Sequence, residues 1–242
     1  MKKLSTVIQY ECVTSIKYAF IFYLALSAVI VTLYGIHYIL TGVLGGGMNC
    51  LEMNTMIFIG ILGILQLTEE FKMLVQNGFT RIYFFLGTFS RFAFMSGVMS
   101  LIDTIIANIL HTLTGTYSTF FGSLYGYGQP VILSWFWLFL IYMLLCTLTF
   151  FFTLVFRNLS KKNAVIAGVL LGTALLAGIS FLFSPASPEN LRDHILKCMI
   201  KGLGFMEDGS IRMIYPLSLL ILSAGFLSIC SYFIIRRTEL KV

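Results

Sequence analysis

Charged side chains are scarce in this 242-residue chain, since Asp, Glu, Lys and Arg together make up 11% of it. Soluble domains usually carry about 25% charged residues and about 45–50% apolar ones. Here 58% of the residues are apolar and the mean hydropathy is +0.93. A water-soluble fold of this size could not hide so much apolar surface, which excludes a soluble enzyme, a disordered tail and a disulfide-rich secreted scaffold. We therefore expect a polytopic membrane protein.

The chain also lacks the short alternating segments that the strands of a membrane barrel require. It has long apolar runs instead, and a helix that crosses a bilayer needs about 20 such residues. Because backbone polar groups in hydrocarbon must be satisfied within the segment, these runs are expected to be helices. We predict an all-α fold with a single transmembrane domain over residues 1–242. The six predicted spans are about 18–40, 51–67, 82–110, 130–156, 163–183 and 213–235.

Motifs of common catalytic and nucleotide sites are absent as well. The chain contains no Gly-Lys-Ser or Gly-Lys-Thr of a P-loop, so it is not expected to bind a nucleotide itself. It has no His-Glu-x-x-His, no Cys-x-x-Cys and no Gly-x-Ser-x-Gly, and so no readable zinc site or nucleophile elbow. We predict no enzyme activity, no metal site and no catalytic residue in this chain. The three histidines, His37, His111 and His194, are expected at or beyond the outer membrane boundary.

Five cysteines are scattered along the chain, and only Cys50 and Cys198 are expected to face the outside. These two either form an extracytoplasmic disulfide or remain separate thiols, because connectivity does not follow from spacing.

The few basic residues are distributed unequally. Twelve of the 16 lie in or beside the N-terminus, the 68–81 and 157–162 linkers and the C-terminus, and four lie between 192 and 212. The positive-inside rule then places both termini in the cytoplasm. The net charge of +6 follows from this asymmetry, and no nucleic-acid partner is expected because the chain has no soluble basic face. The twelve are Lys2, Lys3, Lys17, Lys72, Arg81, Arg91, Arg157, Lys161, Lys162, Arg236, Arg237 and Lys241.

Residues 4–16 precede the first predicted span. Leu4, Ile8 and Cys12 recur at i, i+4, which predicts an amphipathic helix lying along the inner membrane surface. Glu11 and Lys17 interrupt this stretch, which argues against a cleaved signal peptide. The alternative is a frayed N-terminal tail.

Asp103 is the one carboxylate that the predicted spans bury deeply. An ionisable residue at bilayer depth is costly, which makes Asp103 a candidate for a functional intramembrane polar site. Its expected partner is Asn108 or a Ser or Thr of a neighbouring helix. The alternative is a protonated Asp103 that only links two helices by hydrogen bonds.

The 68–81 linker has the pattern of a short helix of its own. Thr68 is a suitable N-cap, acidic residues occupy the first turn, and apolar residues recur at i, i+3 and i+4. Asn77-Gly78 then ends the helix, and Thr80 can cap the next one. We predict a cytoplasmic helix over 69–78 that receives a push from a soluble partner; the alternative is a plain tight turn at Asn-Gly. Its candidate residues are Glu69, Glu70, Phe71, Leu74, Val75, Asn77, Gly78, Thr80 and Arg81.

The run Phe71-x-x-Leu74-Val75-Gln76-Asn77-Gly78-Phe79-Thr80-Arg81 resembles the coupling-helix region of ABC transporter permeases of the type-2 exporter family. Small bacterial members often read Leu-x-Gln-Asn-Gly-x-Ser-Arg there, and Thr80 stands where Ser is common. The resemblance covers the whole chain, with a surface helix, six spans, both termini inside and an outer helical segment between the last two spans.

This resemblance implies the membrane subunit of an ATP-driven exporter in a bacterial plasma membrane. A separate ABC ATPase would bind the coupling helix and hold ATP and Mg²⁺, and a second permease chain, identical or different, would complete the path through the lipid. The apolar spans favour amphipathic or hydrophobic cargo, such as an antimicrobial or toxin peptide, for export or self-immunity. Neither the cargo, the direction of transport nor the substrate-binding residues follow from the sequence. The alternative is a non-transporting immunity or sensor protein that binds a membrane-active peptide.

Two further segments have helical signals. Ser187-Pro188-Glu189 resembles a helix start, so 185–212 is predicted to hold an extracytoplasmic helix that caps the path or lies at the interface. Gly168-x-x-x-Gly172 gives the fifth span a small-residue face for packing against a helix of this chain or of a second one. Trp135, Trp137 and the aromatic residues from 117 to 127 are expected at the water–lipid interface and in packing.

Overall fold

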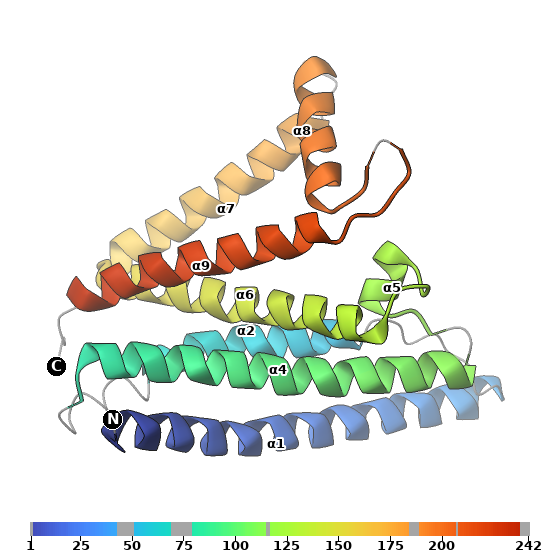
Figure 1. Cartoon of the computed structure of the whole chain (residues 1–242), viewed down its shortest axis with the longest axis horizontal. Helices are drawn as coiled ribbons and strands as arrows, with labels where there is room; N and C mark the ends of the chain where they lie inside the picture. Colours follow the sequence, from blue (N-terminus) through green and yellow to red (C-terminus); the bar gives the residue numbers. More distant parts are fainter. Residues whose placement is uncertain are drawn as a thin grey trace. The chain divides into compact units, whose positions relative to one another are not determined.

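The computed structural model describes residues 2–42, 51–68, 79–114, 117–183, 189–206 and 208–237. Within these ranges every regular element is a helix, and the labels follow Figure 1. The chain divides into two compact units, one formed by residues 1–150 with 240–242 and the other by residues 151–239. Each unit is described by itself.

The first unit is a bundle of long helices that run alongside one another (Figure 1). The helices α1 and α4 run in the same direction, because Glu11 and Tyr23 on α1 meet Arg91 and Asp103 on α4. The helix α2 runs against them, and α6 begins beside the short helix α5 and runs parallel to α2. The elements are α1 (Lys2–Thr41), α2 (Glu52–Thr68), α4 (Arg81–Thr114), α5 (Phe120–Tyr125) and α6 (Val131–Asn158), of which α6 continues into the second unit.

Two glycines allow the helices of this bundle to approach closely. A Cβ atom at Gly87 of α4 would lie 2.9 Å from Cγ1 of Val7 on α1. A Cβ atom at Gly63 of α2 would collide with Oγ1 of Thr149 and lie 2.7 Å from the carbonyl oxygen of Cys146 on α6. Small residues at such points let helix backbones pack tightly in a membrane.

The second unit contains the end of α6 and three further helices. These are α7 (Lys161–Phe183), α8 (Glu189–Gly202) and α9 (Ile214–Arg237). The helix α8 lies in the segment where a helix between the last two apolar runs is expected. The small-residue face of α7 is open, because a Cβ atom at Gly168, Gly172 or Gly178 would meet no described atom within 4 Å.

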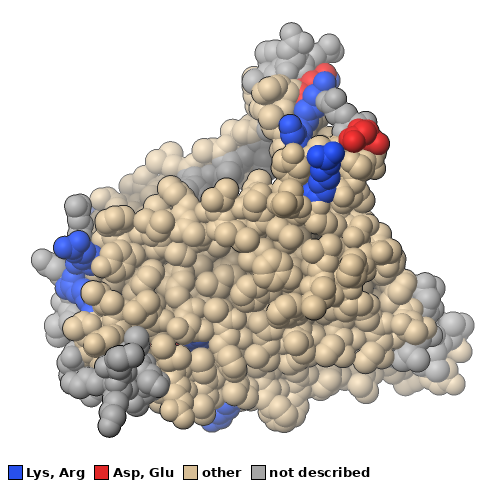
Figure 2. All heavy atoms as spheres, viewed as in Figure 1, with Lys and Arg blue, Asp and Glu red and all other residues tan. Residues whose placement is uncertain are grey.

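The distribution of side chains differs from that in a soluble protein, because apolar residues dominate the surface as well as the core. Large apolar residues such as Phe20, Ile57 and Ile132 are 67–73% exposed, whereas polar and charged side chains are buried inside the first unit. Figure 2 shows a face with few charged side chains, several of which gather on and beside α8. So much exposed apolar surface is typical of a protein whose surroundings are lipid.

Among the described residues, four helices are long and apolar enough to cross a membrane. They are Val7–Leu40, Arg81–Thr112, Val131–Asn158 and Ile214–Arg236, while Glu52–Leu67 and Lys162–Gly178 are shorter apolar helices. The expectation of an all-helical membrane protein is thereby confirmed in this coarser form. All six predicted apolar segments lie in helices, but two of the six fall short of a full span among the described residues.

The N-terminal segment differs from its prediction. Residues 4–16 do not form a separate surface helix, because α1 is one continuous helix of 40 residues, about 60 Å long at 1.5 Å per residue. Glu11 is fully buried in the bundle, whereas Val13 and Ile16 are more than half exposed.

Candidate functional site

A polar network joins three helices near the end of the bundle that carries the N-terminus. Arg91 of α4 donates from Nη1 to Oε1 of Gln66 on α2 at 2.6 Å and to Oε2 of Glu11 on α1 at 3.2 Å. Gln66 donates from Nε2 to both Glu11 oxygens, at 3.4 and 3.3 Å, and to the Thr88 hydroxyl at 3.3 Å. The side chains of Glu11 and Arg91 are 0% and 6% exposed, so this is a buried ion pair.

The network gives two charged residues a role that the sequence does not indicate. The side chain of Arg91, one of the twelve basic residues expected on the cytoplasmic side, is withdrawn from solvent by α1 and α2. Glu11, which argues against a cleaved signal peptide, forms the carboxylate half of the pair. A buried charge is tolerated when it is paired and hydrogen-bonded, and here Gln66 contacts both partners.

A second polar cluster surrounds Asp103, about 18 Å further along α4 from Arg91 at 1.5 Å per residue. Tyr142 of α6 donates to Oδ2 of Asp103 at 2.5 Å, and Tyr23 of α1 donates to Oδ1 at 2.8 Å. Asp103 is 5% exposed, and the fully buried Thr55 of α2 faces the same carboxylate. Asp103 therefore lies at a junction of four helices.

The expected partner of Asp103 is wrong in part. Asn108 donates from its amide to the backbone oxygen of Thr104, one turn before it on α4, and not to Asp103. The partners that bond Asp103 are tyrosines, which the sequence pattern did not single out. A tyrosine hydroxyl can donate one hydrogen bond to a carboxylate in any ionisation state of that carboxylate.

Glu52, the first residue of α2, is a second buried carboxylate on the same side of the bundle. It is 3% exposed, and its Oε1 accepts from the backbone N–H of Phe120 at 3.3 Å. The Tyr117 hydroxyl approaches Oε2 at 3.5 Å, and the Tyr142 hydroxyl lies 3.4 Å from the Glu52 carbonyl oxygen. Tyr142 thus touches both Asp103 and the backbone of Glu52.

The aromatic segment before α6 folds over this end of the bundle. Thr119 caps α5 by accepting the Gly122 N–H on its hydroxyl at 2.8 Å. Phe121 and Tyr125 pack edge-on against Trp137 of α6, which is 4% exposed. Burial raises the pKa of Tyr125 above its ordinary value. Trp137 therefore packs inside the protein, as expected for part of these aromatic residues, whereas Tyr127 is 48% exposed.

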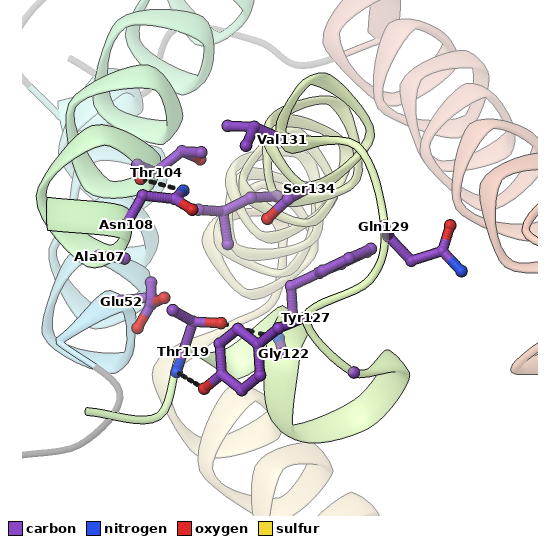
Figure 3. A pocket seen from close by; sticks show the side chains of 13 residues that line it. Glu52, Thr104, Ala107, Asn108, Thr119, Gly122, Tyr127, Gln129, Val131 and Ser134 are labelled. Carbon is purple, nitrogen blue, oxygen red and sulfur yellow. Dashed lines mark hydrogen bonds between the residues drawn. The ribbon is translucent and has the colours of Figure 1, made fainter. Parts of the chain in front are cut away.

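Two small cavities border the buried carboxylates. One, of about 60 Å³, lies between α4, α5 and the start of α6 and has Glu52 in its wall (Figure 3). The other, of about 70 Å³, lies between α1, α2 and α4 and has Asp103, Tyr23 and Tyr117 in its wall. Glu52 lines both cavities, and each is large enough for a few water-sized groups.

The predicted coupling helix lies mainly outside the described residues. Glu69, Glu70, Phe71, Leu74, Val75, Asn77 and Gly78 all belong to that part of the chain. The structure does place Thr80 directly before α4, where its carbonyl oxygen accepts the Phe84 N–H at 3.2 Å. This is the N-cap position that the sequence predicts for Thr80, with Arg81 as the first helical residue.

The other side chains that could bind a metal ion are dispersed. The described residues contain no group of three or more His, Cys, Asp or Glu side chains that could hold a metal ion. Nδ1 of His111 lies 2.8 Å from the Tyr117 carbonyl oxygen, and its ring stacks on Tyr127. Cys198 is an exposed thiol on α8, and Cys50 lies outside the described residues.

The chain has no match among known protein families, curated proteins or solved structures.

Proposed function

We propose that this chain is the membrane subunit of an ATP-driven ABC exporter, powered by a separate ATPase that engages the 69–78 segment. The proposed complex lies in a bacterial plasma membrane, with six spans, both termini in the cytoplasm and a second permease chain. Its cargo is amphipathic or hydrophobic, and a membrane-active peptide is the narrowest candidate. ATP and Mg²⁺ belong to the ATPase, since no P-loop is present in this chain.

The buried Glu11–Gln66–Arg91 network is the observation that carries this proposal. The 69–80 segment joins α2 to α4, so a force applied to it acts first on the ends of these two helices. Gln66 lies two residues before the end of α2, and Arg91 lies about 15 Å along α4 from its start. Because both bind Glu11, a displacement of the segment would be passed to α1 as well.

Such a linkage is what a coupled transporter needs. A partner can drive a conformational change only if it makes different contacts with the two states of the protein. The 69–80 segment joins two antiparallel helices, and hydrogen bonds connect these two helices to a third. A partner that moves the segment would therefore move all three helices. The apolar exterior of the helices supports the placement of the 69–80 segment at a membrane surface.

The partner is tested by affinity capture of the full-length chain, solubilised in detergent from its native host. We expect a P-loop ATPase to co-purify, and we expect the double substitution Phe71→Ala and Leu74→Ala to abolish its capture. Ile82→Ala is the matched control, because Ile82 is an apolar residue 51% exposed in the first turn of α4, next to the same segment. This control is expected to retain the ATPase.

Two results would refute the proposal. One is capture of no ATPase by the unsubstituted chain, and the other is undiminished capture by the Phe71 and Leu74 double variant. The immunity or sensor alternative predicts the first result. It also predicts that the neighbouring gene encodes a kinase, or that no neighbouring gene exists, in place of an ATPase gene.

A further inference from the structure

Glu52 and Asp103 are two buried carboxylates that form no ion pair with a Lys or Arg among the described residues. No Lys or Arg occurs between Lys17 and Lys72 or between Arg91 and Arg157. Arg91 is about 18 Å from Asp103 along α4 and already bonds Glu11 and Gln66. A buried carboxylate is either neutral or paired with a cation, so a cation supplied by another molecule could pair with one of these two.

An independent feature of the cavity beside Glu52 indicates a ligand. The hydroxyl of Thr104 lines this cavity, is buried, and has no hydrogen-bond partner among the described residues. Leaving a buried hydroxyl without a partner costs free energy, so such a group is usually completed by water or a ligand. Figure 3 shows Thr104, Asn108 and Ser134 around the same space as Glu52.

We propose that the cavity lined by Glu52 and Thr104 binds the primary ammonium group of an amphipathic ligand. The wall includes the Glu52 carboxylate, the Thr104 and Ser134 hydroxyls and the Asn108 side-chain amide, whose oxygens can accept from N–H donors. The cavity suits a small cationic head better than a metal ion, because no group of three ionisable ligands surrounds it among the described residues.

The surroundings of the cavity suit the remainder of such a ligand. Tyr127 and Val131 at its rim are 48% and 54% exposed, which gives the head group an entrance. Phe121 and Leu138 add apolar wall, and Ile132 nearby on α6 is 73% exposed. A hydrocarbon or peptide chain attached to the ammonium group would lie against this apolar surface. Asp103 lies behind the site and is linked to the Glu52 backbone through Tyr142.

The test uses octylammonium as the probe and the full chain in nanodiscs of neutral lipid. Both tryptophans of the chain lie on α6, and Trp137 packs against Phe121 in the cavity wall, so tryptophan fluorescence reports binding. Octanol has the same chain without charge, and octyltrimethylammonium has the charge without N–H donors. We expect saturable binding of octylammonium and binding of both analogues that is weaker by about tenfold or more, because a charged hydrogen bond is lost.

Two substitutions locate the binding site. Glu52→Gln retains an oxygen for the Phe120 N–H but removes the charge, and it is expected to weaken octylammonium binding by about tenfold or more. Thr104→Val preserves the side-chain shape and removes the unpartnered hydroxyl, and it should weaken binding about threefold to tenfold. Asp208→Asn removes an exposed carboxylate elsewhere and should leave binding unchanged.

A purely structural role for Glu52 makes a different prediction. In that case Glu52→Gln would lower the unfolding temperature while the folded variant bound octylammonium as the unsubstituted chain does. Unchanged affinity in both Glu52→Gln and Thr104→Val, or equal binding of octanol and octylammonium, would overturn the proposal. The experiment contains no ATPase, so its outcome does not depend on the proposed transport function.

Discussion

Arg91 is a buried guanidinium at the junction of three helices. It bonds a carboxylate and an amide oxygen from two other helices. Withdrawing a guanidinium and a carboxylate from water costs several kcal/mol per ion, and their attraction offsets this cost only when the geometry is good. The pair is therefore better explained as a device that fixes the relative positions of three helices than as a large source of stability.

Removing one partner of this pair should be far more harmful than removing both. Arg91→Met leaves Glu11 buried without its cation, and we expect the free energy of unfolding to fall by about 3–5 kcal/mol. The double variant Glu11→Leu with Arg91→Met should recover most of this loss. Denaturant unfolding of the detergent-solubilised chain measures both effects. Lys17→Met, at an exposed position of α1, is the control, and equal losses in the single and double variants would contradict the interpretation.

Between elements, the approach of α2 to α6 is set by the absence of a side chain at Gly63. The neighbouring Gly60 is one turn away on the same helix, yet a Cβ atom there would lie 3.6 Å from Thr149, an ordinary contact. The two glycines therefore differ in function although they look alike in sequence. Gly63 lies opposite the backbone of Cys146, whose sulfur approaches the Ile59 carbonyl oxygen at 3.6 Å.

This difference predicts opposite outcomes for one type of substitution. Gly63→Ala should destabilise the chain by about 1–3 kcal/mol, because the methyl group cannot fit without a shift of α2 or α6. Gly60→Ala should be neutral or stabilising by up to about 1 kcal/mol, because Ala favours the helix more than Gly does. The thermal unfolding midpoints of the two variants in detergent provide the comparison. A Gly63→Ala variant as stable as Gly60→Ala would show that the helices are not in tight contact there.

At the scale of the whole molecule, the first unit has an apolar exterior, and its interior holds charged and polar side chains beside apolar ones. Exposed Ile, Val, Leu and Phe side chains cover α1, α2 and α6, while Glu11, Glu52, Arg91 and Asp103 lie inside. Such a protein is stable only where its exterior contacts hydrocarbon. The orientation of the chain in that hydrocarbon remains a prediction from its basic residues.

The predicted orientation can be measured with a membrane-impermeant maleimide. In a chain that keeps Cys198 as its single cysteine, we expect labelling in intact cells, because the 189–202 helix is predicted outside and Cys198 is exposed. In a cysteine-free chain with Ser160→Cys, at the exposed turn between α6 and α7, labelling should require permeabilised cells. The reverse pattern would place the termini outside and would contradict the positive-inside prediction.

Several features of the site could be predicted from the sequence, and others could not. Asp103 was identified because a carboxylate within an apolar run is conspicuous, and the start of α4 after Thr80 follows from its capping signal. Glu11 and Glu52 were missed because each lies near the end of an apolar run, where a solvated charge is the ordinary expectation. Glu11 and Tyr23 are 12 residues apart, and so are Arg91 and Asp103. This equal spacing was the available signal that the two helices pair.

Composition and the order of the apolar runs were sufficient to predict a helical membrane protein, because the cost of burying backbone polar groups in lipid allows few alternatives. They could not show which face of each helix is turned inward. In a lipid environment the outer face of a helix is as apolar as its packed face. Hydrophobic periodicity therefore does not indicate which face is buried, as it does in a soluble protein. Only the tertiary structure brings Glu11 to Arg91, Asp103 to its two tyrosines and Glu52 to an otherwise uncharged cavity, because these contacts join residues 39 to 80 positions apart.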